Sequence, residues 1–89
     1  MDYIRKQFTD IFDLSPEITL DLPLVMLVGQ QRLYIENHKG ITLYNPDEIK
    51  IRVKSGIITL TGKGLMIEDI KTENLSISGQ IEGIFYDKG

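Results

Sequence analysis

The amino-acid sequence predicts a mainly β protein, with about eight short strands in an antiparallel meander that curls into a small sandwich or half-barrel. Between Leu24 and Tyr86, short stretches of alternating apolar and polar residues are separated at close intervals by Gly, Asn, Pro or Ser. Connections this short usually join neighbouring strands as antiparallel hairpins. A compact β-solenoid with parallel rungs is the alternative, although the glycines show no fixed repeat.

The 89 residues suffice for one domain, and 42% hydrophobic with 26% charged residues is an ordinary globular composition. We expect residues 17–86 to form a single β domain, preceded by a helix within residues 1–14. The formal net charge of -3 argues against a nucleic-acid groove, which needs clustered Lys and Arg. No cysteine is present, and neither a signal peptide nor a membrane span is readable.

The first segment has helical rather than strand periodicity. Four apolar residues recur at the spacing that places them on one helical face, Ile4, Phe8, Ile11 and Phe12. Ser15 and Pro16 should end this helix, because the residue before a proline disfavours the helical conformation. Two roles stay open for the apolar face: completing a thin core, or contacting another protein or a membrane surface.

Strands are expected in order along the remaining chain, each with alternating or wholly apolar residues. They fall near residues 17–22, 24–28, 32–36, 41–44, 48–54, 57–61, 65–69, 75–78 and 80–86. Pro23 suits an edge or a strand start because it lacks a donor N–H. The segment 62–64, Gly-Lys-Gly, and Gly79 are expected to be turns between strands.

The segment 37–40 is predicted to be the tip of a hairpin, since Asn tolerates positive φ and Gly carries no Cβ. Exposed tips often contact partners, so Asn37, His38 and Lys39 are candidate partner-binding residues. His38 is the only histidine, and one histidine without cysteine cannot build a zinc site. It also cannot serve the scattered serines as a hydrolase base in any recognised motif.

Lys50, Arg52 and Lys54 alternate with apolar residues in one predicted strand and form a basic stripe. The stripe is either a solvated face or a docking patch for an acidic partner or anionic head groups. Two other motifs are weak. Gly62-Lys63-Gly64 lacks the full phosphate-loop pattern. The acidic run Glu68, Asp69 and Glu73 could hold a divalent cation but is more typical of a solvated strand end. No cofactor or metal is expected.

A longer pattern runs through the chain: Gly29-x-x-x-Leu33-Tyr34-Ile35-Glu36-Asn37-His38-x-Gly40-Ile41, then alternating Ile and Val, Leu65-x-Ile67, and Leu75-x-Ile77-x-Gly79-x-Ile81. This pattern resembles the YabP/YqfC family of sporulation proteins. The Leu-Asp-Leu-Pro segment at 20–23 and the Ile-Glu-Asn-His-Lys-Gly segment at 35–40 are most similar to the YqfC branch.

The resemblance implies a non-enzymatic role in endospore formation, on the mother-cell side of the forespore's outer membrane. It also implies an integral-membrane sporulation protein as partner and a contribution to cortex or coat assembly. The leading hypothesis is therefore an interaction module, which could also self-associate through strand edges. The alternatives are a self-assembling, bactofilin-like structural protein and a small ligand-binding or hydrolytic domain built around His38.

Overall fold

The computed structural model describes residues 21–88, which form one antiparallel β sheet. Its six strands are β1 (Leu24–Val28), β2 (Arg32–Glu36), β3 (Gly40–Asn45), β4 (Glu48–Val53), β5 (Gly56–Ile70) and β6 (Asn74–Asp87). Their order across the sheet is β1-β2-β6-β5-β4-β3, and every neighbouring pair is antiparallel. The antiparallel β class is thus confirmed, and the parallel-rung solenoid is wrong.

The expected N-terminal helix, its apolar face and most of the strand expected at 17–22 lie outside the described residues. The expected boundary between residues 1–14 and 17–86 lies outside them as well. Within residues 21–88 no helix is present.

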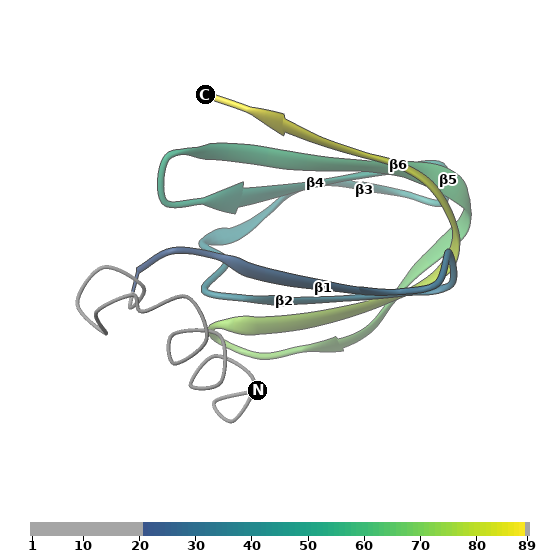
Figure 1. Ribbon diagram of the computed structural model, residues 1–89, viewed down its shortest axis with the longest axis horizontal. Coiled ribbons are helices and arrows are strands. Elements are labelled where there is room, and N and C mark those ends of the chain that lie inside the picture. The colour runs from purple at the N-terminus through teal and green to yellow at the C-terminus, as the bar shows by residue number, and fades with distance from the viewer. Residues whose placement is uncertain (1–20, 89) are drawn as a thin grey trace.

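Two long strands fold the sheet over on itself. β5 and β6 bend together at one end of the molecule, so each contributes to two layers (Figure 1). The first half of β6 pairs with β2 and with the end of β5, next to β1. The first half of β5 pairs with β4 and with the second half of β6, next to β3. The result is a sheet curled into a small two-layered sandwich.

The core lies between the two layers and follows the predicted alternation. In β4, Ile49, Ile51 and Val53 are buried while Arg52 between them is exposed. The same rule selects the other buried apolar residues, which are Leu33, Ile35, Ile58, Leu60, Leu65, Leu75, Ile77 and Ile81. Full burial of one such side chain stabilises the fold by about 1.5–3 kcal/mol.

The turns expected at 62–64 and at Gly79 are wrong, because these glycines lie inside β5 and β6. Gly64 and Gly79 have positive φ, 60° and 131°, and the β5–β6 register shifts between Lys63 and Met66. The glycines therefore bulge and bend two continuous strands at the corner of the sandwich. The eight ranges expected between residues 24 and 86 correspond to six strands, because each bent strand reads as two in the sequence.

The hairpin expected around 37–40 is also wrong. β2 pairs with β1 and β6, and β3 pairs with β4, so β2 and β3 are not neighbours in the sheet. Residues 37–39 instead carry the chain from one layer to the other. The positive φ of Asn37 (64°) and Gly40 (129°) was expected, but it serves this crossover and not a hairpin tip. The arrangement is consequently no simple meander.

Candidate interaction surfaces

His38 is buried, with 6% of its surface exposed, and does not stand at an exposed tip. Its Nδ1 accepts a hydrogen bond from the Gly40 N–H (3.1 Å), and its Nε2 lies 3.0 Å from the Lys71 carbonyl oxygen. Because a carbonyl oxygen only accepts, Nε2 carries the proton and donates it. Both ring nitrogens are engaged by the backbone, so His38 fastens the crossover to the β5–β6 turn.

Two backbone hydrogen bonds and one side-chain hydrogen bond also hold the crossover in place. The His38 N–H donates to the Glu73 carbonyl oxygen (3.2 Å), and the Lys39 N–H donates to that of Arg52 (2.7 Å). The Asn37 side-chain amide donates to the Leu22 carbonyl oxygen (3.1 Å). Of the three candidate residues at 37–39, only Lys39 is classed as exposed.

The basic stripe lies on the outer face of β4 and in the turn that follows. Arg52 and Lys54 are exposed and Lys50 is partly buried. Lys54 forms an ion pair with Asp21 (3.7 Å), in which both side chains are more than half exposed, so the pair contributes little stability. Phe85 and Asp87 share this outer face through Thr59 and Ile57, their partners in β5. The face therefore combines cations with apolar surface and nearby acids, among them Asp21 and Asp87.

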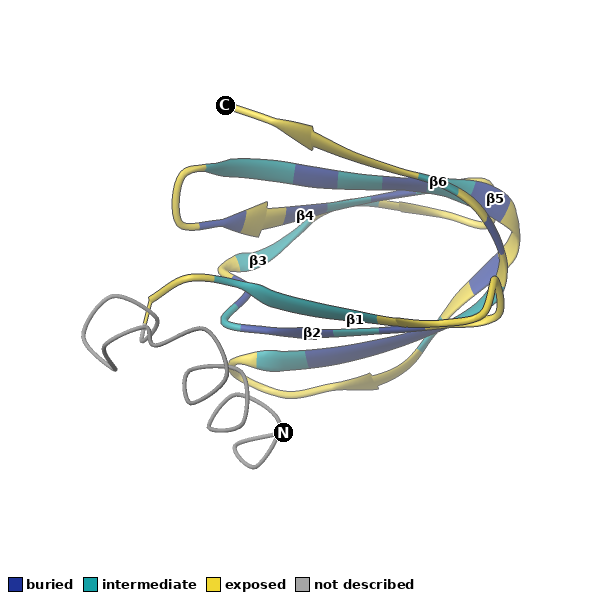
Figure 2. Ribbon diagram, viewed as in Figure 1, coloured by how far each residue is buried: buried dark blue, intermediate teal, exposed yellow. Residues whose placement is uncertain are grey.

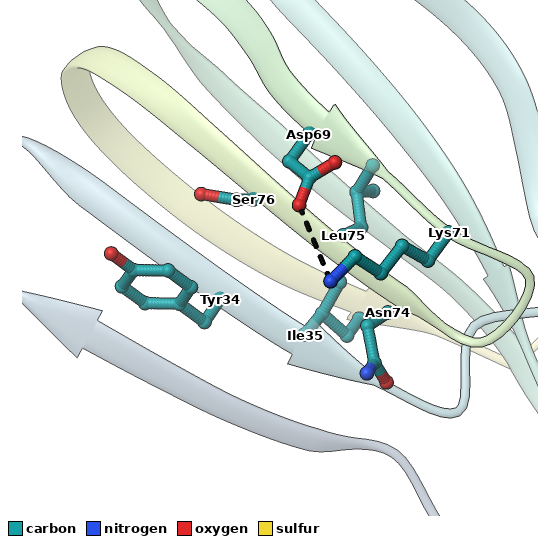
Figure 3. A pocket seen from close by; sticks show the side chains of 7 residues that line it. All are labelled: Tyr34, Ile35, Asp69, Lys71, Asn74, Leu75 and Ser76. Atoms are coloured by element: carbon teal, nitrogen blue, oxygen red, sulfur yellow. Dashed lines mark ion pairs between the residues drawn. The ribbon is translucent and has the colours of Figure 1, made fainter. Parts of the chain in front are cut away.

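A shallow pocket of about 230 Å³ opens on the outer face of the other layer, between β2, β6 and the end of β5 (Figure 3). Its polar groups are the Tyr34 and Ser76 hydroxyls, the Asn74 amide, and an exposed ion pair between Asp69 and Lys71 (3.8 Å). The positive and negative charges of this pair compensate each other. The arrangement offers hydrogen bonds to a polar group but no nucleophile beside a base.

The acidic residues near 68–73 do not converge. The Ser78 hydroxyl donates to a carboxylate oxygen of Glu68 (2.5 Å), while Asp69 faces Lys71. Within residues 21–88 no group of three His, Cys, Asp or Glu is placed to hold a metal ion. Residues 21–88 contain no helix that could cross a membrane.

The two open sides of the sandwich differ. On one side the Tyr44 hydroxyl of β3 accepts a hydrogen bond from the Ile67 N–H of β5 (3.1 Å), which links the two layers. The β3–β4 turn adds two more links, where the Gly62 N–H donates to Asp47 O (3.1 Å) and the Leu65 N–H donates to Pro46 O (2.8 Å). This side is therefore held together by hydrogen bonds along the edge of β5.

On the other side, the hydrogen bonds that join the two layers within residues 21–88 come from the β1–β2 turn. The Gly79 and Ile81 N–H groups donate to the carbonyl oxygens of Gln31 (3.2 Å) and Gln30 (2.8 Å). Beyond a register shift at Glu82, residues Gly83–Asp87 pair with β5 on one side and, among residues 21–88, with no strand on the other. We call this stretch the β6 free edge.

The β6 free edge is rich in exposed apolar side chains. Ile84, Phe85 and Tyr86 are 40%, 58% and 56% exposed. Ile84 and Tyr86 face the inside of the sandwich, opposite Leu60 and Ile58, while Phe85 faces outward opposite Thr59. In Figure 2 this arm of β6 is coloured as exposed up to the C-terminal end. A patch of this kind on a strand edge is typical of a contact site.

The sequence interpretation identified a strand at 80–86 but did not single out its edge. A signal was available: Ile84, Phe85 and Tyr86 are consecutive, so they place apolar groups on both faces of one strand. Such a strand is either covered on both faces or exposed at an edge. Only the pairing order across the sheet decides between these two cases.

Comparison with known proteins places the chain in a family. Residues 23–89 match the YabP family, and over 83 residues the chain is 32% identical to the protein YqfC of Bacillus subtilis (strain 168), itself described as uncharacterized. That alignment covers 93% of this chain and 89% of the Bacillus protein. The chain belongs to the YabP family. The segment of this chain that matches the YabP family begins one residue before β1 and includes all six strands. The curled sheet therefore corresponds to the family's domain.

Proposed function

We propose that this YabP-family chain is a non-enzymatic sporulation protein that acts as an interaction and assembly module. Its partner is an integral-membrane sporulation protein at the outer membrane of the forespore, on the mother-cell side, and the complex supports cortex or coat formation. Family membership carries the proposal, because it suggests a sporulation-related protein.

The chemistry of the described residues supports a binding role. His38, the only histidine of the chain, uses both ring nitrogens to hold backbone groups, which leaves it unsuited to proton transfer with a substrate. The exposed surfaces consist instead of strand edges, apolar residues and a basic stripe. These are features through which proteins contact other proteins.

We assign the membrane partner to the outer face of β4, with Lys50, Arg52 and Lys54, and to the apolar residues Ile4, Phe8, Ile11 and Phe12 of the N-terminal segment. Lys39 remains a candidate contact, whereas buried His38 is withdrawn as one. The antiparallel sheet gives no support to a bactofilin-like solenoid, so that alternative is not proposed.

Deletion of the gene in its own organism tests the proposal. We expect the yield of heat-resistant spores to fall and the wild-type gene to restore it. A Lys50→Glu/Arg52→Glu variant should restore it poorly, because the charge of the stripe is reversed. The matched control is Lys63→Glu/Lys71→Glu, which makes the same change in net charge on exposed residues away from β4. Spores formed at the normal level without the gene would contradict the proposal.

A further inference from the structure

Apolar residues lie on both faces of β1. Val25 packs against the core, so the residues that alternate with it point outward, and these are Leu24, Met26 and Val28. The outward residues of β2 lie opposite these three and are Glu36, Tyr34 and Arg32. A strand with apolar residues on both faces is stable when both faces are covered. The outer face of β1 and β2 therefore needs a cover.

Burial on this outer face decreases from one end of the strands to the other. Glu36 is 5% exposed, and among residues 21–88 no other Asp or Glu is buried. Tyr34 is partly buried, and Arg32, at the far end of β2, is exposed. β1 changes in the same direction, from partly buried at its start to exposed near the β1–β2 turn (Figure 2). A cover thus lies over the end at which β1 begins.

No described strand provides this cover. β1, β2, β6 and the end of β5 lie side by side in one layer, and the layer of β3 and β4 lies against their inner face (Figure 1). Residues 21–23 reach the buried end of the outer face, since the Asn37 side chain donates to the Leu22 carbonyl oxygen (3.1 Å). Asp21 and Leu22 are themselves exposed, however, and three residues are too few to cover two strands. The exposed fractions are those of a single chain, so the remaining cover comes from the chain itself.

The N-terminal segment is the part of the chain that fits this position. It leads into β1 through residues 21–23, at the buried end of the face. A helix within residues 1–14 would be about 20 Å long at most, comparable to the five-residue strands β1 and β2 at about 17 Å each. Residues 15–20 span up to about 20 Å when extended, which suffices to turn the helix back onto the strands. The expected helix has one apolar face, and such a face packs against a sheet.

We propose that the N-terminal segment folds back on its own chain and covers the outer face of β1 and β2 at the Glu36 end. The two apolar surfaces then in contact are Ile4, Phe8, Ile11 and Phe12 of the segment and Leu24, Met26 and Tyr34 of the strands. The sandwich thereby gains a third layer. This docking does not depend on the proposed function. The membrane partner, to which the same side chains of the segment are assigned, reaches them only after the segment leaves the sheet.

Protection of a thiol on the covered face tests the docking, because the chain has no native cysteine. A Met26→Cys thiol should react slowly with a neutral maleimide in the full chain. Adding Phe8→Glu/Phe12→Glu should speed the reaction at least about fivefold, because the segment is released from the strands. The matched control is Gln7→Glu/Thr9→Glu, which makes the same change in net charge outside the apolar face and should leave the rate unchanged.

A thiol at the uncovered end of β1 is the positional control. Val28, 51% exposed, replaced as Val28→Cys, should react at one rate in all three backgrounds. A Met26→Cys rate that Phe8→Glu/Phe12→Glu leaves unchanged overturns the proposal. An equal increase with the matched control overturns it as well. Circular dichroism verifies that each variant folds.

A spin label on the segment gives a second test that leaves the apolar face intact. Carried on Thr9→Cys, the label should broaden the amide NMR signals of Met26 and Tyr34 much more than those of Lys50 and Thr59, on the outer face of the other layer. Isotope-labelled chains mixed with separate spin-labelled chains should show no such broadening. Equally strong broadening in this mixture would assign the face to a second copy, and equal broadening of both layers would show an undocked segment. Either result overturns the proposal.

Discussion

His38 joins two connections that lie far apart in the sequence. Its ring receives the Gly40 N–H from the start of β3 and donates to Lys71 O in the turn between β5 and β6. Buried polar groups must be hydrogen-bonded to avoid a large desolvation cost, and here the imidazole satisfies two backbone groups at once. The histidine that the sequence offered as a candidate catalytic residue therefore has a structural role.

Replacement of this side chain should destabilise the fold. We expect His38→Ala to lower the free energy of unfolding by about 2 kcal/mol, because two hydrogen bonds are lost and a space is left among buried atoms. Urea denaturation followed by circular dichroism measures the change. The neighbouring Lys39→Ala is the control. Its side chain is exposed, so a change within about 0.5 kcal/mol is expected. An unchanged free energy of unfolding in His38→Ala would show that the two hydrogen bonds of the imidazole contribute nothing to stability.

For single residues, the sequence predicted the backbone conformation better than it predicted the burial of the side chain. The positive φ of Asn37 and Gly40 follows from residue type alone. The burial of His38 could not be predicted, because it depends on Lys71 and Glu73, which the pairing of β2 with β6 brings next to it.

The sheet curls because β5 and β6 bend, and glycines make this bend possible. At Gly79 a Cβ would stand 2.6 Å from the Gly64 carbonyl oxygen and 2.9 Å from the Leu65 Cα. Both of these are backbone atoms, which cannot move aside as a flexible side chain could. Two glycines thus face each other across the bend, where the strands approach too closely for any side chain.

Gly79→Ala should therefore be costly. We expect it to lower the free energy of unfolding by about 2–3 kcal/mol, from the strained φ and the clash together. Gly29→Ala is the matched control: its φ of 56° is also positive, but nothing lies within 4 Å of the added Cβ. There only the left-handed conformation is penalised, by about 1 kcal/mol. Thermal or urea unfolding compares the two variants, and equal costs would contradict the close approach at the bend.

For the elements, alternation of apolar residues predicted where strands lie and which side chains are buried, as in β4. It did not predict that 57–61 and 65–69 are one strand, because a glycine marks a turn and a bulge equally well. The same ambiguity concealed the continuity of β6 through Gly79. The strand that leaves an edge free was thus located in the sequence, but the edge itself was not.

The whole molecule is an asymmetric sandwich. One open side is joined by Tyr44 and the β3–β4 turn. Among the residues that the structure describes, the other side is joined near Gln30 and Gln31, where the β1–β2 turn meets β6. The asymmetry leaves β1 and the β6 free edge on the same, less protected side.

The antiparallel class was predictable from short turns and alternation, while the pairing of β2 with β6 was not. Strands far apart in sequence give no local signal of their pairing, and the crossover at 37–39 resembles a hairpin turn residue by residue. The family likewise could be inferred only from the whole-chain pattern, and it carries the functional conclusion because no single residue does so.

Affinity capture of the tagged, full-length chain from the membranes of sporulating cells tests the central claim most directly. The account predicts that an integral-membrane sporulation protein co-purifies with the wild-type chain and is depleted with Lys50→Glu/Arg52→Glu, but not with the control Lys63→Glu/Lys71→Glu. Recovery of no integral-membrane protein from cells that contain the folded chain would contradict it.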